Sequence, residues 1–600
     1  MKSWPAKALL LAGIGALVAG IPALGQDRDA PESLLPPGFG DPQTLPPPEE
    51  KGPAQQARPN AQHGNSISAD SSGTGNSLGD VEEVALDQTA LPRPSNYFTI
   101  PEGSERPFDL VGPLQPGNFG LAPGAFGGTQ SGLVAGLVRR LDAPLPSRWT
   151  SILLRRAMLS RAAAPRGIGP VDWVAERAAL LLRMGEADGA RMLVQAVDVE
   201  HYTPRMVEVA AQTALATADP AALCPLVAPA RSWSNDPVWT LADGMCAALE
   251  GEAARASALI DAARGRGGTG IDLLLAEKVV GAGAQTQRGV EVEWRGVGEI
   301  DPWRFGLASA TGVEIPAPLM ARAGPRIQAW FARAPMVPLE QRLQAASTAT
   351  ALGVFSSHAL VEIHSLMLDR TDPAETAGTV GARLRSAWID REPEQRLTAM
   401  RSLWTENDLT ALDRHARLIL TAGAAARIPP SDDHAADSAN LIASMLTAGM
   451  DRQAARWAPL VEQGGAADRA WAMLAVGAPR PMVSVDGGRL ETFADGDDSP
   501  GAIRSRLLVA ALAGLGRIDA DTAAGAGFRL TADDLWSRAI DQAARDRSQG
   551  TVALLAGVGM QTSNWTGVPP AYLFRIVRAL RAVGMDYEAR MIAAEALARV

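Results

Sequence analysis

From about residue 131 onward, hydrophobic residues recur every three or four positions, the spacing of a helix that buries one face. The pattern is clear after Pro170, a residue that favours the first turn of a helix, and again near the end of the chain. Strand-like alternation is confined to two short stretches, 290–294 and 482–485, and either could be a loop. The sequence therefore predicts an all-α fold. The helical positions are Val171, Val174, Ala178 and Leu181 in the first segment and Leu573, Ile576, Val577 and Leu580 in the last.

A recurring phrase joins these helices in pairs. A glycine is followed five residues later by an alanine in "LRMGEADGARMLV", "ALEGEAARASALI", "TAGMDRQAARWAPLV" and "AVGMDYEARMIAAEA". Glycine tolerates the left-handed conformation that ends a helix, and a small residue one turn into the next helix allows close approach. The successive glycines are 66, 198 and 135 residues apart, close to multiples of about 34. The pairs are Gly185 and Ala190, Gly251 and Ala256, Gly449 and Ala454, and Gly584 and Ala589.

On these phrases, residues 170–600 resemble the TPR-like α-solenoid class, although the fuller W-x2-L-G-x2-Y…P signature is absent. The resemblance implies a right-handed solenoid of helical hairpins, each contacting mainly its neighbours. Such a stack suits the helical region, 131–600, because about 470 residues exceed what one core usually supports. Tryptophans would fill the gaps between hairpins, with sugar or peptide binding as the alternative. The tryptophans expected to fill these gaps include Trp239, Trp388, Trp457, Trp536 and Trp565.

The segment before the helices has the composition of a disordered linker. Residues 27–130 contain 16 proline and 14 glycine residues, about 29 per cent of the stretch. That share is typical of low-complexity chain that buries too little apolar surface to fold. We therefore predict a disordered Pro/Gly/Ser-rich linker over 26–130. The cluster Tyr97–Ile100 is the one place in this zone that could dock onto a surface.

The first 25 residues have the pattern of a secretory signal peptide. Lys2 and Lys7 precede an apolar run, and Ala23-Leu24-Gly25 forms a small-x-small site, so cleavage is expected after Gly25. The apolar run is short for a membrane span, with an uncleaved anchor as the alternative. We expect a mature periplasmic chain without a transmembrane anchor, since no later segment offers about 18 uninterrupted apolar residues.

The charge pattern gives no reason to expect a nucleic-acid partner. The formal net charge is −10, and 52 of the 56 basic residues are arginine. The arginines are dispersed rather than clustered on one segment, so no basic patch is predicted. The arginine bias, together with abundant alanine and glycine, is typical of codon usage in a GC-rich genome.

Cys224 and Cys246 are the only cysteines in the sequence. They have no C-x-x-C spacing and no nearby histidine, so a zinc or redox site is not indicated. Asp236-Pro237 marks a turn about midway between them, and both lie in apolar helical sequence. Two lone cysteines in an exported protein usually pair. We therefore predict a structural disulfide that joins two helices of one hairpin.

Other motifs lack the context that chemistry requires. Ser77 in "GNSLG" lies in the linker rather than between a strand and a helix. "GRGGTG" at 265–270 follows a helix, not a strand, and reads as a turn between hairpins. His358 and His364 are six residues apart, which places them on different faces of one helix. The acidic stretches 431–437, which contains His434, and 495–498 are interpreted as a helix cap and an exposed loop. No catalytic, cofactor or metal residue is assigned.

The leading functional hypothesis is a non-enzymatic scaffold or adaptor for protein–protein interaction in the bacterial cell envelope. A long helical-repeat surface suits binding, and no residue constellation indicates chemistry. The alternative is a hydrolase of cell wall or polysaccharide with a carboxylate pair in a helical cleft. A structural spacer is the second alternative.

Overall fold

The computed structural model describes residues 103–266, 270–283, 290–463, 468–530 and 533–600. Within these ranges the regular structure is helical, and β-structure is limited to two isolated bridges. The stretches 290–294 and 482–485 form no strand. The prediction of an all-α fold is therefore confirmed.

The helices of the first half are α1 (Ser131–Arg140), α2 (Arg148–Leu159), α3 (Pro170–Arg183), α4 (Ala187–Val194), α5 (Pro204–Ala216), α6 (Cys224–Arg231), α7 (Pro237–Leu249), α8 (Ala253–Gly265), α9 (Ile271–Gly283), α10 (Pro302–Thr311), α11 (Ala317–Arg322), α12 (Pro325–Arg333), α13 (Leu339–Ala351) and α14 (Ser357–Arg370). Those of the second half are α15 (Val380–Ile389), α16 (Pro393–Trp404), α17 (Ala411–Ala425), α18 (Ser438–Thr447), α19 (Asp451–Ala454), α20 (Ala458–Glu462), α21 (Asp468–Gly477), α22 (Gly487–Asp495), α23 (Ile503–Leu515), α24 (Ala520–Gly525), α25 (Leu535–Arg545), α26 (Gln549–Gly559), α27 (Pro570–Ala582) and α28 (Asp586–Arg599).

The four glycine–alanine phrases all form tight turns between consecutive helices. Each glycine has a φ between 77° and 87°, in the left-handed region. After α3, the Gly185 N–H donates to the Leu182 carbonyl at 3.1 Å, and the Glu186 N–H donates to the Leu181 carbonyl at 2.8 Å. This pair of bonds is the Schellman motif, which satisfies carbonyls that a helix end leaves unpaired. The alanine five residues after each glycine is fully buried, so helices approach closely there.

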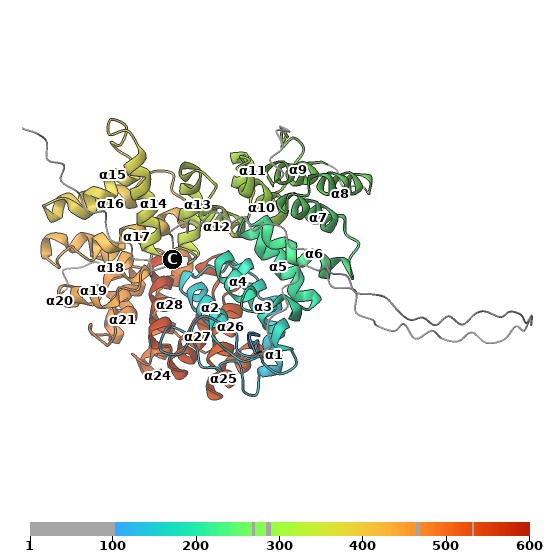
Figure 1. Ribbon diagram of the computed structural model, residues 1–600. Helices are drawn as coiled ribbons and strands as arrows, with labels where there is room; N and C mark the ends of the chain where they lie inside the picture. The colour runs from blue at the N-terminus through green and yellow to red at the C-terminus, as the bar shows by residue number, and fades with distance from the viewer. Residues whose placement is uncertain (1–102, 267–269, 284–289, 464–467, 531–532) are drawn as a thin grey trace, which may run out of the picture. The chain divides into compact units, whose positions relative to one another are not determined.

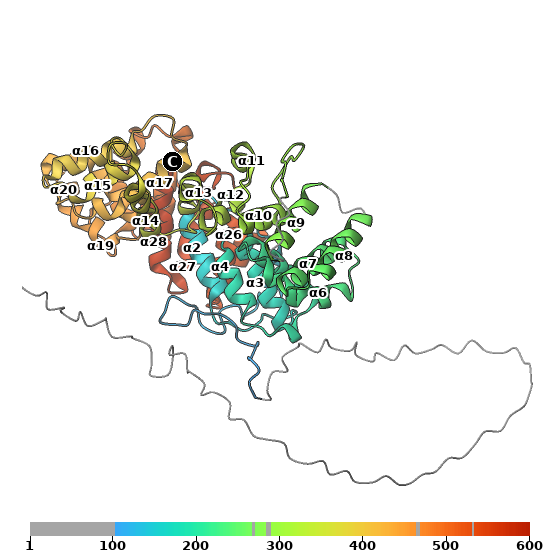
Figure 2. The same ribbon diagram turned by 45° about the horizontal axis from the view of Figure 1, so that its top comes forward.

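Helices that are neighbours along the chain pack together, as in α3 with α4, α7 with α8, α12 with α13 and α17 with α18. The two ends of the helical region also meet. Helix α2 contacts α26 and α28, and α1 contacts α26 (Figures 1 and 2). Helix α28 further contacts α18, α21 and α23. Contacts between α2 and α28 go beyond the neighbour-to-neighbour packing of a simple repeat array.

Residues 103–130, called here the N-terminal strap, contain no helix and lie against the helical region. Val111, Leu121 and Phe126 of the strap are buried, and Phe126 meets Trp173 of α3 edge to face, with ring centroids 5.0 Å apart. The proline- and glycine-rich composition predicts a disordered linker here, whereas residues 103–130 dock on the helices. The apolar residues of the strap are spaced irregularly, so they give no periodic signal, yet they dock in extended and turn conformations.

Polar contacts hold both ends of the strap. The Arg106 guanidinium donates to Asp198, which is 6 % exposed, at 2.7 Å. At the other end, the Thr129 N–H donates to the Asp546 carboxylate at 2.7 Å. Asp198 precedes α5 and Asp546 follows α25. The strap therefore connects the N-terminal helices to the C-terminal helices.

The large aromatic side chains serve mainly in the core. Trp239, Trp457 and Trp565 are buried. Trp388 and Trp536 are partly buried and pack against the same core. The packing interpretation thus fits all five, while Trp388 also lines a surface groove described below.

Within the described ranges, none of the helices combines the length and the apolar character that a bilayer crossing requires. The signal peptide predicted for residues 1–25 lies outside the described residues. So do residues 26–102 of the predicted linker, including the Tyr97–Ile100 cluster.

Candidate functional site

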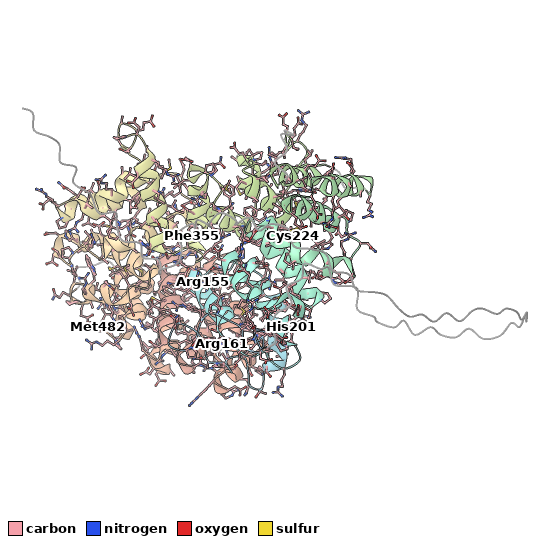
Figure 3. All side chains as sticks on the ribbon, in the orientation of Figure 1. Arg155, Arg161, His201, Cys224, Phe355 and Met482 are labelled. Atoms are coloured by element: carbon pink, nitrogen blue, oxygen red, sulfur yellow. A yellow bond between two sulfur atoms is a disulfide. The ribbon has the colours of Figure 1, made fainter. Side chains whose placement is uncertain are left out.

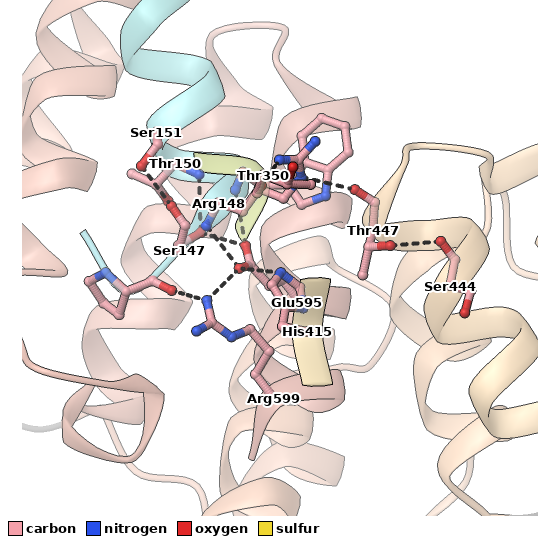
Figure 4. Close-up of polar contacts among 12 residues, drawn as sticks. Ser147, Arg148, Thr150, Ser151, Thr350, His415, Ser444, Thr447, Glu595 and Arg599 are labelled. Carbon is pink, nitrogen blue, oxygen red and sulfur yellow. Dashed lines mark hydrogen bonds and ion pairs between the residues drawn. The ribbon is translucent and has the colours of Figure 1, made fainter. Parts of the chain in front are cut away.

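Glu595 of α28 lies at the N-terminus of α2 in a buried polar cluster (Figure 4). Its Oε1 accepts a hydrogen bond from the Arg148 N–H at 2.8 Å, and its Oε2 accepts one from the Trp149 N–H at 3.0 Å. The Ser147 hydroxyl also donates to Oε2, at 2.8 Å. The carboxylate therefore satisfies N–H groups that have no partner within α2. It also places a negative charge at the positive end of the helix dipole.

The Arg148 side chain extends these connections to two more helices, α13 and α18. It donates to the carbonyls of Thr350 in α13, Phe355 just after α13 and Thr447 at the end of α18. Burial lowers the pKa of Arg148 to about 10, partly offset by the nearby Glu595 carboxylate. The guanidinium thus stays charged at neutral pH. It ties α2 to α13 and α18 as Glu595 ties α2 to α28.

His415 of α17 completes the cluster. It is 3 % exposed, and its Nε2 lies 3.8 Å from Glu595 Oε1. Neither ring nitrogen has a hydrogen-bond partner among the described residues. Burial, followed by the charges of Arg599 and Arg148, holds the pKa of His415 well below its ordinary value. Because this cluster is closed to solvent, it positions helices rather than binding a ligand.

Replacing His415 with leucine is expected to make the protein less sensitive to acid. His364 of α14 is a second buried histidine, and burial lowers its pKa to about 4. An unfolded histidine titrates near pH 6.5, so below that pH the unfolded chain binds more protons than the folded chain. The free energy of unfolding therefore falls with falling pH, by about 2 kcal/mol for each of His415 and His364 between pH 7 and pH 5.

Denaturant unfolding at pH 7 and pH 5 measures this effect. The His415→Leu variant should lose about 2 kcal/mol less than the wild type over that interval, because the leucine carries no proton. The control Ile419→Val trims a buried, non-titrating side chain of the same helix, so it should lower stability equally at both pH values and keep the wild-type pH dependence. The same pH dependence in wild type and His415→Leu would show that His415 does not cause the acid sensitivity.

An open groove of about 620 Å³ lies between α14, α15 and α17, the helices drawn in yellow in Figure 1. This volume is in the usual range of ligand-binding pockets. Ile389 at its rim is 61 % exposed, although it is a large apolar side chain. We call this feature the α14–α17 groove. Its apolar wall consists of Val361 and Leu368 of α14, Leu384, Trp388 and Ile389 of α15, and Leu420 of α17.

Two glycines inside helices shape this groove. A Cβ atom on Gly423 of α17 would lie 2.5 Å from Cζ2 of Trp388, so only glycine lets the indole rest on α17. The Arg427 guanidinium stacks over the same indole, 4.5 Å from the ring centroid. Gly381 of α15 similarly allows close contact with Leu368 of α14. From the sequence, Trp388 is expected to fill a gap between hairpins, and in the structure it also forms part of this wall. Gly381 and Gly423, in the first and last turn of their helices respectively, were the signals in the sequence that could have pointed to this wall.

Two charged side chains line the groove without ion-pair partners among the described residues. Asp369 of α14 and Arg385 of α15 carry opposite charges, and His358 lies at the start of α14. Asp369 is the one carboxylate among the described lining residues. The acid/base mechanism of a glycosidase uses two carboxyl groups. The groove therefore suits binding of a partly apolar ligand better than hydrolysis.

The structure contains the predicted disulfide between Cys224 and Cys246 (Figure 3). Cys224 begins α6, and Cys246 lies in α7, which starts at Pro237 after the turn. The two Cα atoms are 5.5 Å apart, within the normal range for a disulfide. Closing a loop of this length stabilises the fold by roughly 3 kcal/mol in the chain-entropy model.

The acidic stretches considered in the sequence are held by internal contacts. Asp437 accepts hydrogen bonds from the Arg401 guanidinium at 3.0 and 2.6 Å. His434, three residues earlier in the chain, is buried. Asp497 accepts from the N–H and hydroxyl groups of Ser505. Across the described ranges, no three potential metal-ligating side chains gather at one point. Ser77 and part of the 265–270 stretch lie outside the described residues.

No family model, curated protein or solved structure matches this chain. The resemblance to TPR-like solenoids therefore stays a prediction from the sequence. We infer function from the geometry of the α14–α17 groove.

Proposed function

We propose that the protein is an exported, non-enzymatic scaffold or adaptor that binds a partner polypeptide in the bacterial cell envelope. One observation carries this proposal: the α14–α17 groove presents an apolar wall with two charges of opposite sign, neither of which forms an ion pair within the described part of the chain. The occupant we propose is an amphipathic helix of the partner, because a groove between helices accepts the apolar face of another helix. Its basic and acidic residues would meet Asp369 and Arg385.

The order of the charges along the groove defines the partner further. Gly381, at the start of α15, packs on Leu368, one residue before Asp369 in α14. Arg385 follows Gly381 by one helical turn, about 6 Å along α15. A bound helix should therefore carry its basic residue near the α14–α15 connection and its acidic residue roughly one to two turns away. Ile389, one further turn along α15, would contact an apolar residue at the other end.

The cellular location and the repeat architecture are parts of the same proposal. The signal-like pattern of residues 1–25 and the disulfide both favour an oxidising compartment outside the cytoplasm. We propose the periplasm. We further propose that the hairpins from α3 onward continue as a right-handed, TPR-like solenoid, with the linker before the strap acting as a tether.

Photo-crosslinking of the full chain in its native envelope tests this function. A crosslinker at position 358 captures the partner, and purified partner then gives an affinity for each variant. Ile389→Asp should weaken binding by about tenfold or more, because it puts a charge on the apolar rim. The control is Met336→Asp, since Met336 is 60 % exposed and is not among the residues that line the groove.

Two results would overturn the proposal. Equal weakening by Ile389→Asp and Met336→Asp would show that the groove is not the binding surface. Release of soluble sugars from purified cell-wall material by the wild-type protein would favour the hydrolase alternative instead.

A further inference from the structure

A second groove runs along α23, on helices that take no part in the α14–α17 groove. It consists of two adjoining hollows of about 560 and 290 Å³, which share Arg506, Val509 and Ala526. The larger hollow lies between α22, α23 and α24. The smaller continues past Phe528 to the turn at Pro569, just before α27. We call the two together the α23 groove.

Two exposed apolar side chains follow Phe528 and Arg529, lining residues of the smaller hollow, along the chain. Leu530, two residues after Phe528, is 48 % exposed, and Leu535 is 79 % exposed. Leu535 is the most exposed large apolar side chain in the described part of the chain. It follows Asp534, whose carboxylate accepts a hydrogen bond from the Tyr572 hydroxyl at 2.6 Å, and Tyr572 is the residue after Ala571, which lines the smaller hollow. Exposed apolar side chains around a groove are typical of a docking surface.

The charges of this groove are mainly basic. Arg506 and Arg529 line it and have no ion-pair partner among the described residues, whereas Glu491 is its one acidic lining residue. Neighbouring arginines are paired: Arg504 with Asp498 at 2.7 Å, and Arg578 with Asp541 at 2.6 Å. Unpaired guanidinium groups offer forked donors that match carboxylates.

We propose that the α23 groove docks an acidic amphipathic helix of a partner polypeptide. The apolar face of such a helix would cover Leu530, Leu535 and the groove floor. Its carboxylates would pair with Arg506 and Arg529. A polyanion without an apolar face, such as a nucleic acid or an acidic glycan, would leave the apolar part of this surface uncovered. This site is separate from the α14–α17 groove and does not rest on the function proposed for it.

Three fluorescent designed peptides, added to the full chain, test the proposal. The first has leucines at positions i, i+3, i+4 and i+7 and glutamates on the flanking positions. The second has lysine in place of each glutamate, and the third keeps the glutamates but has serine in place of each leucine. Fluorescence anisotropy is expected to give a dissociation constant at least about tenfold lower for the first peptide than for either other peptide.

Charge reversal in the protein then identifies the groove. The double variant Arg506→Glu, Arg529→Glu should bind the lysine peptide more tightly than the glutamate peptide, which reverses the order seen with wild type. The control is Arg140→Glu, an exposed arginine of α1 outside the groove, which should keep the wild-type order. Unchanged circular dichroism and Tm verify that both variants fold. The proposal is overturned if no peptide binds, if the first and third bind equally, or if charge reversal leaves the order unchanged.

Discussion

Replacing Glu595 with alanine is expected to lower the free energy of unfolding by about 3–5 kcal/mol. The change would leave the N–H groups of Arg148 and Trp149 and the Ser147 hydroxyl without the acceptor they now share. It would also leave the buried positive charge of Arg148 and the partly exposed charge of Arg599 without their carboxylate. Uncompensated buried donors and charges are among the most costly single defects in a protein. Denaturant unfolding at pH 7 measures the loss.

Two further variants test this explanation. Glu595→Gln keeps one acceptor oxygen but turns an amide N–H toward backbone donors, so about half of the loss is expected. Glu588→Gln is the matched control, because Glu588 is also on α28 and pairs with Arg156 at 3.0 Å in a more exposed position. It should cost less than about 1 kcal/mol. A loss below that value for Glu595→Ala would show that other contacts hold α2 to α28.

The local elements of the fold were accessible from the sequence because their causes are local. Helices follow from apolar spacing, and the turns at Gly185 and its three counterparts follow from one residue that tolerates a positive φ. The disulfide followed from composition and a turn signal. Two similar turns were not predicted, because they contain no glycine at the position with a positive φ. They place Ala218 and Arg547 at φ values of 53° and 54°, a conformation that residues other than glycine rarely adopt.

Contacts between distant parts of the chain left no comparable signal. The bond between Ser147 and Glu595 joins residues 448 positions apart, and Glu595 reads in sequence as an ordinary helix glutamate. Trp388 becomes part of the wall of the α14–α17 groove only when α14, α15 and α17 pack together. The strap docks through irregularly spaced side chains, which a periodicity analysis treats as linker. The local pattern of residues thus specifies the helices. Long-range packing creates the polar cluster around Glu595, the docking of the strap and the two grooves.

Replacing Arg177 with methionine is expected to detach the strap and to lower the free energy of unfolding by about 3 kcal/mol. Arg177 of α3 is fully buried and donates to the carbonyls of Met158 at 3.1 Å, Ser160 at 2.9 Å and Val111 of the strap at 2.9 Å. Burial lowers its pKa to about 9, so it stays charged at neutral pH. No carboxylate in the described residues pairs with it. The carbonyls at the C-terminus of α2 supply the compensating negative potential.

Hydrogen exchange distinguishes loss of the strap from a general loss of stability. The Leu114 N–H donates to the Leu159 carbonyl at 3.1 Å, so it reports on strap docking. The matched variant Arg183→Met removes another arginine of α3, one that donates to carbonyls of Val138 and Leu141 and does not touch the strap. Arg177→Met should expose Leu114 to rapid exchange, whereas Arg183→Met should destabilise the protein but keep that amide protected. Equal protection of the Leu114 amide in both variants would mean that apolar contacts hold the strap. Arg177 would then act only as a donor to the carbonyls at the C-terminus of α2.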